Sequence, residues 1–155
     1  MSTILFGCQI EDNSTPSYTY NLNLKITDIN GTDLVTEIPY KPNPSTDPTY
    51  DIDTDECELK SLTKGVGLGL IYTQIDEEIQ SLYISLGSRE SKYQSVTFLL
   101  TSRYIFKDMV PRKITTTWEH NYYDGVCTSL KFEDEEFTVT KNETNFFNYA
   151  TIIVD

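Results

Sequence analysis

Alternation of apolar and polar residues with a period of two is the feature that most restricts what this chain can fold into. It is clearest over residues 18–27, where five apolar residues alternate with polar ones: Tyr18, Tyr20, Leu22, Leu24 and Ile26. Successive side chains of a β-strand point to opposite faces, so this pattern predicts a strand that is buried on one face. No stretch of the sequence shows apolar residues at helical spacing over three turns. The chain is therefore expected to be all-β.

Further short runs of strand-forming residues follow at roughly even spacing. They cover residues 50–53, 58–62, 67–73, 81–86, 95–102, 113–119, 127–132, 136–140 and 148–154. Polar or glycine-containing turns separate them, and Asn30 with Gly31 is a strong hairpin signal because both residues tolerate a positive φ. Three prolines in the loop 41–55 restrict residues 50–53 to a brief edge strand. Residues 74–80 are expected to form a single helical turn.

A chain of 155 residues is long enough for one domain with a sizeable core. Its short strands, with eleven tyrosines and seven phenylalanines, predict a single antiparallel β-sandwich of the immunoglobulin-like type. A small up-and-down β-barrel is the alternative. Val96, Phe98 and Leu100 are expected to share one face of their strand.

The net charge of the chain limits the classes of function that it can have. Twenty-four acidic residues against twelve basic ones give a net charge of −12, which repels phosphate backbones and argues against a nucleic-acid partner. The one histidine, His120, excludes a multi-histidine metal site, and we interpret it as a surface or hydrogen-bonded residue. Residues 133–136 are four consecutive acids, which fit a solvated hairpin tip. The sequence contains no nucleophile elbow, zinc-protease or phosphate-loop motif.

The chain turns abruptly from apolar to polar at Cys8. The segment Leu5-Phe6-Gly7-Cys8 resembles the lipobox of bacterial lipoproteins, in which a small residue precedes the cysteine whose thiol receives the lipid. On this interpretation residues 1–8 are the remnant of a signal peptide, 9–17 a polar tether and 18–155 the β-sandwich domain. The alternative is a short strand or frayed end of a cytosolic protein, with Cys8 a plain small hydrophobic residue.

Several segments together resemble a group of uncharacterised cell-envelope lipoproteins from gut Bacteroidetes. They are Cys8 with its acidic followers Glu11 and Asp12, and residues 22–35, 96–102, 104–108, 113–118 and 127–132. Lys107 departs from the pattern, because it stands where a glycine is expected in the turn. The resemblance implies a β-sandwich anchored by lipid to the outer membrane, with the acidic followers pointing to the cell surface. It implies no catalytic or ligand-binding residues.

An acidic loop offers a candidate metal site. Asp51, Asp53 and Asp55 alternate along the chain, and calcium binds six to eight oxygen atoms. An EF-hand would need a glycine and a glutamate where Glu56 and Leu62 stand, so the candidate is an irregular Ca²⁺ site. A solvated acidic loop is the alternative.

The remaining cysteines are Cys57 and Cys127. In an oxidising envelope compartment an even pair can form a disulfide. Otherwise both thiols are expected to be buried small hydrophobic side chains.

Aromatic residues gather towards the carboxy-terminal end, near predicted loops: Tyr122, Tyr123, Phe146, Phe147 and Tyr149. Exposed aromatic rings can bind sugar rings or protein partners, which makes them candidate binding residues. The alternative is that they fill the core or cover its ends.

The leading hypothesis is a non-enzymatic, lipid-anchored envelope protein that acts by binding or structural association. Its partners would be the membrane, through the anchor, and a protein or glycan ligand; apart from the Ca²⁺ candidate no cofactor is expected. A second hypothesis is a cytosolic acidic immunity-type protein that neutralises a basic toxin by charge complementarity. A third is a small hydrolase that uses facing carboxylates.

Overall fold

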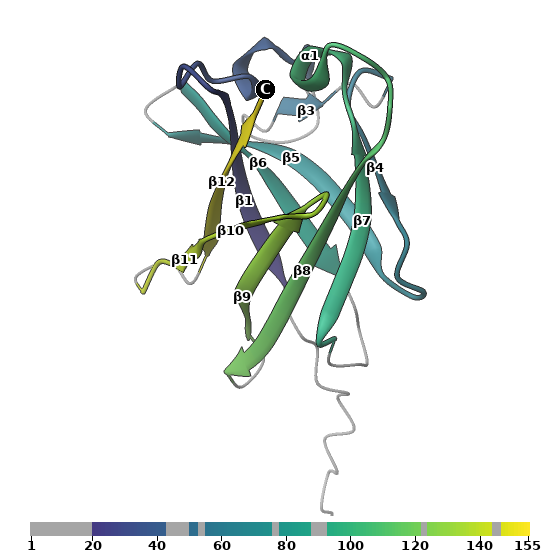
Figure 1. Ribbon diagram of the computed structural model, residues 1–155, viewed down its shortest axis with the longest axis vertical. Coiled ribbons are helices and arrows are strands. Elements are labelled where there is room, and N and C mark those ends of the chain that lie inside the picture. Colours follow the sequence, from purple (N-terminus) through teal and green to yellow (C-terminus); the bar gives the residue numbers. More distant parts are fainter. Residues whose placement is uncertain are drawn as a thin grey trace, which may run out of the picture.

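The computed structural model consists almost entirely of β-strands arranged as two sheets that pack face to face (Figure 1). The structure describes residues 20–42, 50–52, 55–75, 78–87, 93–121, 124–143 and 147–155. The predicted all-β sandwich is confirmed. The barrel alternative is wrong, because the strands of the described residues form two separate sheets and not one closed one.

The larger sheet has seven strands in the order β11-β12-β1-β6-β5-β3-β2. Their bounds are β1 (Asn21–Asp28), β2 (Tyr40–Pro42), β3 (Tyr50–Ile52), β5 (Gly67–Ile75), β6 (Glu78–Gly87), β11 (Val139–Lys141) and β12 (Asn148–Val154). Strands β1 and β12 pair in parallel, from Asn23 opposite Tyr149 to Asp28 opposite Val154. The other pairings in this sheet are antiparallel.

The smaller sheet has five strands in the order β10-β9-β8-β7-β4, all antiparallel. Their bounds are β4 (Glu58–Ser61), β7 (Ser95–Thr101), β8 (Arg112–Asn121), β9 (Asp124–Phe132) and β10 (Glu135–Phe137). Two short helices, the 3-10 helix Val35–Glu37 and α1 (Arg103–Phe106), lie at the upper end of the sandwich in Figure 1. Neither of these helices is long or apolar enough to cross a bilayer.

The core lies between the two sheets. Leu22, Leu24 and Ile26 of β1 are fully buried, as the period-two pattern predicted. From the other sheet, β7 contributes a shared buried face that was also predicted: Val96, Phe98 and Leu100. Burial of these alternating side chains is the main favourable term that holds the sheets together.

Two sequence-based expectations about β1 and the β5–β6 hairpin are wrong. The helical turn expected over residues 74–80 is not formed at the described positions: β5 extends to Ile75, β6 begins at Glu78, and a bulge at Thr73/Gln74 shifts their register. Because cross-strand pairing continues as far as Ile75 opposite Glu78, these residues keep the strand conformation. In β1, the expected solvent-facing side is buried at Asn21 and Asn23.

Candidate functional site

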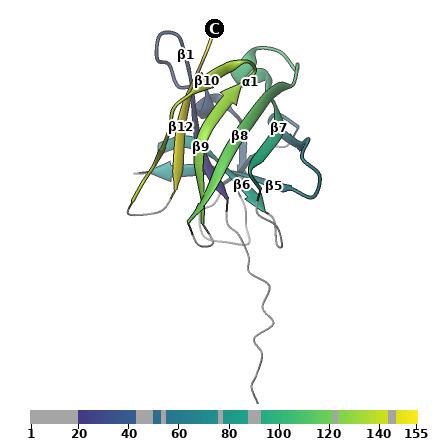
Figure 2. The same ribbon diagram turned by 60° about the horizontal axis from the view of Figure 1, so that its bottom comes forward.

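One segment belongs to both sheets. β10 pairs with β9 in the smaller sheet, where Phe137 lies opposite Leu130. β11 pairs with β12 in the larger sheet, where Val139 lies opposite Ala150, and only Thr138 separates the two strands. Figures 1 and 2 show this ribbon running from β9 to β12. The sequence predicted one strand over residues 136–140; the structure corrects this to two strands in different sheets.

The transfer to the other sheet leaves half of β12 without a neighbour on one side. β11 pairs only with Asn148–Ala150 of β12. The remaining residues, Thr151–Val154, pair with β1 alone among the described residues. Backbone groups of successive strand residues point to alternate sides, so every second N–H and C=O of this half points away from β1. It presents an unpaired strand edge.

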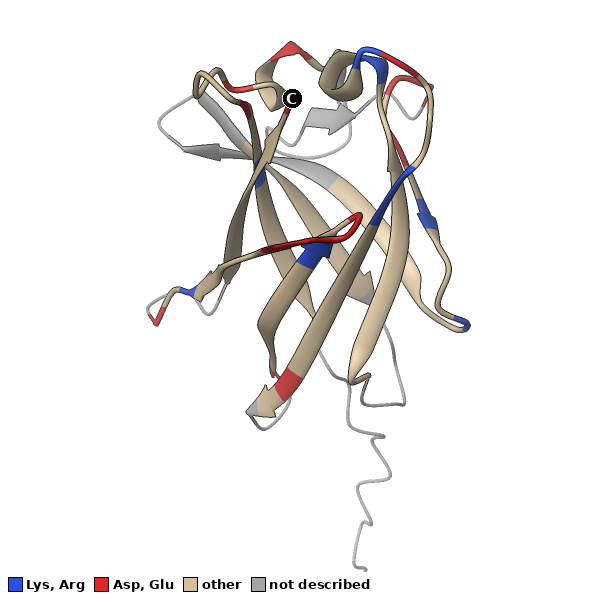
Figure 3. Cartoon of the chain, in the orientation of Figure 1, with Lys and Arg blue, Asp and Glu red and all other residues tan. Residues whose placement is uncertain are grey.

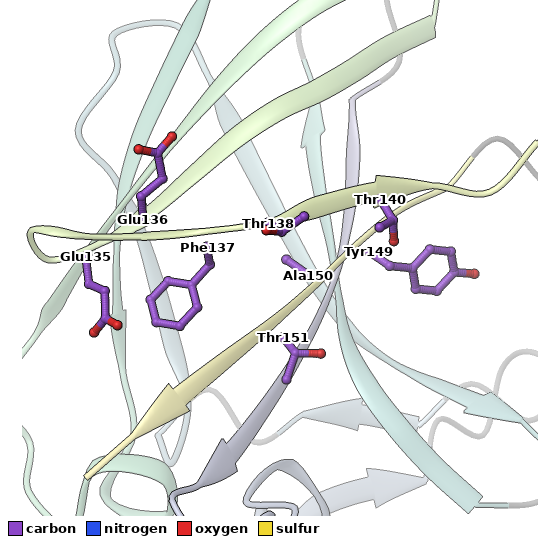
Figure 4. Close-up of a pocket in the computed structure, with 8 residues that line it drawn as sticks. All are labelled: Glu135, Glu136, Phe137, Thr138, Thr140, Tyr149, Ala150 and Thr151. Atoms are coloured by element: carbon purple, nitrogen blue, oxygen red, sulfur yellow. The ribbon is translucent and has the colours of Figure 1, made fainter.

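A hollow of about 450 Å³ lies between β10 and β12 and reaches the first residue of this edge, Thr151 (Figure 4). Glu135, Glu136 and Phe137 line it from β10, and Tyr149, Ala150 and Thr151 line it from β12. Thr138 and Thr140 complete the lining. In Figure 4 the Glu135 and Phe137 side chains project from the same side of β10, and Glu136 projects from the other side.

A second hollow of about 280 Å³ shares Glu135 with the first and continues along β12 to its end. Its β12 side is Ile153, Val154 and Asp155, and its opposite side includes Phe132. Ile153 is 52% exposed although it is large and apolar. We call the two hollows together the edge groove. It combines an unpaired strand edge with apolar side chains, and its volume is in the range of ligand-binding pockets.

Aromatic stacking holds the upper wall of the edge groove in place. The rings of Phe106 and Phe132 are stacked with their centroids 5.7 Å apart, and the Arg112 guanidinium lies 5.3 Å from the Phe106 ring centroid. Arg112 also forms a 2.8 Å ion pair with Asp108. The pKa of Asp108 is lowered, chiefly because its carboxylate accepts a hydrogen bond from the Val110 N–H and also because Arg112 is near. The positive charge of Arg112 is thereby largely balanced within this wall.

The rim of the edge groove is acidic. Glu133 to Glu136 form the turn between β9 and β10 and the start of β10, and this hairpin tip is drawn as a continuous red segment in Figure 3. All four residues are exposed, as the sequence predicted for a solvated tip. Glu133 adopts a φ of 54°, and its side chain accepts a hydrogen bond from the Lys113 N–H at 2.9 Å. The carboxylates of Glu135 and Glu136 remain beside the groove.

The opposite half of β12 is closed by a buried polar cluster around Asn148, which has no exposed surface. Its side-chain nitrogen donates to the carbonyl oxygens of Asn21 at 3.0 Å and of Gly125 at 3.2 Å. Its side-chain oxygen accepts from the Cys127 N–H at 2.9 Å. Since Asn21 belongs to one sheet and Gly125 and Cys127 to the other, Asn148 connects the two sheets.

A second polar cluster surrounds His120 near the lower end of the sandwich. The Tyr20 hydroxyl and His120 Nε2 share a hydrogen bond of 2.6 Å, and the Tyr93 N–H donates to the Tyr20 oxygen at 2.8 Å. The Tyr20 ring packs edge-on against Trp118 at a centroid distance of 5.3 Å. His120 is thus a hydrogen-bonded residue, as its sequence context indicated.

The predicted calcium ligands are only partly within the described residues. Asp51 lies in β3, Asp55 is exposed in the turn before β4, and Asp53 lies outside the described residues. Within the described part of the chain, no group of three acidic, histidine or cysteine side chains is arranged to hold a metal ion. Cys8 also lies outside the described residues.

The disulfide alternative for Cys57 and Cys127 is wrong, because both are free and buried. Cys57 precedes β4 and Cys127 is on β9, with β7 and β8 between them. Three strand spacings amount to about 14 Å, far beyond the roughly 7 Å that a disulfide can span between Cα atoms. Burial raises the pKa of each thiol to about 12. The alternative prediction, two buried small side chains, is confirmed.

The predicted binding aromatics are only partly brought together. Tyr122, Tyr123 and Phe146 lie outside the described residues. Phe147 is half-buried and packs against Tyr83, with ring centroids 5.7 Å apart. Tyr149 lines the edge groove. The other lining residues could not be recognised as a site from the sequence, because only the folded structure brings residues 135–137 and 149–151 together around one hollow.

No family model, curated protein or solved structure matches this chain.

Proposed function

We propose that this protein is a lipid-anchored binding module of the bacterial cell envelope that holds a protein partner in its edge groove. The observation that carries the proposal is the hollow between β10 and β12, where apolar side chains and an acidic rim adjoin an unpaired strand edge. A binding site needs a concave surface with apolar contacts and a few polar groups that fix orientation, and the edge groove offers both.

The direction in which β1 and β12 run is compatible with a lipid anchor at Cys8. β1 and β12 are parallel, and in Figure 1 both run from the lower end of the sandwich to the upper end. A lipid at Cys8 would therefore attach at the lower end, where β1 begins. A tether of nine residues, 9–17, spans at most about 30 Å when extended. The Ile153–Asp155 end of the groove would then face away from the membrane.

A second candidate function is a cytosolic immunity-type protein that blocks a basic toxin. The acidic rim of the edge groove and the net charge of −12 favour it, because a basic partner would be attracted to this surface. Both candidates use the same groove. They differ in what happens at Cys8.

Metabolic labelling with a palmitate analogue, applied to cells that express the full-length gene, separates the two candidates. We expect the label on the wild-type protein and none on the Cys8→Ser variant. A wild-type protein that carries no lipid would contradict the envelope proposal and leave the immunity-type protein.

Site-specific photo-crosslinking tests the groove itself. A photoreactive residue in place of Phe137 should trap a partner protein in cells, whereas the same residue in place of Leu62 should trap none. Leu62 is a suitable control because it is 51% exposed and directly follows β4 at the other edge of the smaller sheet. Equal or absent trapping at both positions would contradict a binding role for the edge groove.

A further inference from the structure

We infer that the partner binds as an extended segment that adds a strand to Thr151–Val154 of β12 and carries lysine or arginine at alternate positions. This inference rests on the proposed function, because it specifies how the edge groove holds its partner.

The unpaired edge supplies the main-chain part of this recognition. β12 is held in extended conformation by its parallel pairing with β1 up to Val154. Its pairing with β11 ends at Ala150, so an added segment would pair with β12 from Thr151 onward, beyond the last residue that β11 pairs with. Extended peptides bind such edges through main-chain hydrogen bonds, while pockets for alternate side chains give specificity.

The space beside the edge suits a strand. The two hollows, of about 450 Å³ and about 280 Å³, follow β12 from Tyr149 to Asp155. Phe137 and Ile153 line them and offer apolar contacts to every second side chain of an added segment. The groove therefore adjoins the free edge at Thr151, Ile153 and Val154.

The charges at the edge groove determine which kind of partner segment fits there. Glu135 and Glu136 stand at the groove, and Asp155 lies at its end. The one basic residue that lines the groove in the described part of the chain, Arg112, is paired with Asp108. A segment with lysine or arginine complements this rim. A second copy of this chain is disfavoured, because each copy carries a net charge of −12.

The edge of the smaller sheet formed by β4 provides a contrast. Its exposed residues are Glu58 and Lys60, charges of both signs on a strand of four residues. Short edge strands with charged side chains are a common way to prevent strand addition. The exposed β12 residues Thr151 and Ile153 carry no charge. This difference places strand addition at β12 and not at β4.

A synthetic peptide tests the inference directly. The probe is a capped seven-residue peptide of alternating lysine and valine, titrated into the purified protein at about 50 mM salt, where charge attraction is little screened. Two N-methylated versions block the hydrogen bonds of one peptide edge or of the other. We expect one version to bind at least tenfold more weakly than the parent and the other to bind within about threefold. Amide hydrogen exchange should slow at Thr151–Val154 when the parent peptide is bound.

Matched variants test the charge selection. Replacing Glu135 and Glu136 by glutamine should weaken peptide binding about threefold to tenfold, whereas Glu58→Gln should leave it unchanged. Circular dichroism of each variant verifies that the fold is intact.

Three results would overturn the inference: no binding of the parent peptide, equal binding of both N-methylated versions, or protection of amides elsewhere than in β12. Any of them would leave the proposed function standing if the crosslink at Phe137 still traps a partner, since the groove would then bind by side-chain contacts alone.

Discussion

The two halves of β12 differ in how many neighbouring strands they pair with. Asn148–Ala150 is paired on both sides and connected to the opposite sheet through the buried Asn148 side chain. Thr151–Val154 is paired on one side only, and Thr151, Ile153 and Val154 line the edge groove, which also reaches Tyr149 and Ala150. The closed half is stabilised by a buried cluster of hydrogen bonds around Asn148. The open half has outward-directed backbone groups without a second strand partner among the described residues.

The difference teaches that the transfer of the chain at Thr138 from one sheet to the other decides where this sandwich is open. On the carboxy-terminal side of Thr138, β11 pairs with β12. On its amino-terminal side, β10 pairs with β9 in the other sheet. Four measurements sharpen or break this comparison.

The largest effect is expected from Asn148→Ala in the closed half. The variant leaves the Cys127 N–H and the Gly125 and Asn21 carbonyls without their partner in a buried site. An unsatisfied buried polar group costs roughly 1–3 kcal/mol, so we expect the free energy of unfolding to fall by about 3 kcal/mol in urea denaturation. Asn30→Ala, at an exposed turn position, should change it by less than about 0.5 kcal/mol. A loss below about 1 kcal/mol for Asn148→Ala would show that the cluster does not close this half.

Gly125→Ala should have the next largest effect. A Cβ atom at this position would lie 2.6 Å from Tyr20 Cδ1 and 3.0 Å from Trp118 Cε3, so the ring cluster would have to move. Overpacking of this kind costs about 1–3 kcal/mol. Gly69→Ala is the matched control, because its Cβ would meet Ser85 Cβ at an ordinary 3.6 Å. Thermal denaturation should separate the two variants, and equal melting temperatures would contradict the tight packing at Gly125.

Hydrogen exchange compares the two halves directly. In the unliganded protein, the outward-directed amides of Thr151–Val154 should exchange at least about tenfold faster than those of Asn148–Ala150 that bond to β11, a difference of about 1.4 kcal/mol in opening free energy. Amide exchange followed by NMR gives the rates residue by residue. Equal protection along the whole strand would mean that the upper edge is covered.

The smallest effect concerns Asp28, which ends β1 beside the open half. Its carboxylate accepts hydrogen bonds from the Thr32 and Asn30 N–H groups, which lower its pKa from the ordinary value of 3.8. The folded state therefore binds this proton less readily than the unfolded state, and the stabilisation is present above about pH 4 and lost as the pH falls through the folded pKa. The unfolding midpoint of the wild type should fall slightly more than that of Asp28→Asn between about pH 5 and pH 2.5. Parallel curves would contradict this role.

Much of the fold could be predicted from the sequence, because period-two burial is a local signal. Val96, Phe98 and Leu100 share a buried face as predicted. The pattern failed at Asn21, which was assigned to the solvent side. Its backbone and side chain are bonded to Asn148, 127 residues later in the chain, and no local pattern carries that contact.

The edge groove could not be predicted from the sequence, for a related reason. The acidic tip at residues 133–136 was recognised, but residues 136–140 were predicted as one strand. Only the pairing of Phe137 with Leu130 and of Val139 with Ala150 reveals two strands in two sheets. Because pairing partners are set by the whole topology, the groove between those strands is a property of the assembled fold.

The parallel pairing of β1 with β12 has a consequence for biosynthesis. Since β1 is flanked by β6 and β12, its second edge is covered only after β12 has been synthesised. Pairings between such distant segments form slowly. A polypeptide that stays incompletely folded until β12 has been made remains suitable for threading through a translocation channel, which the envelope location we propose would require.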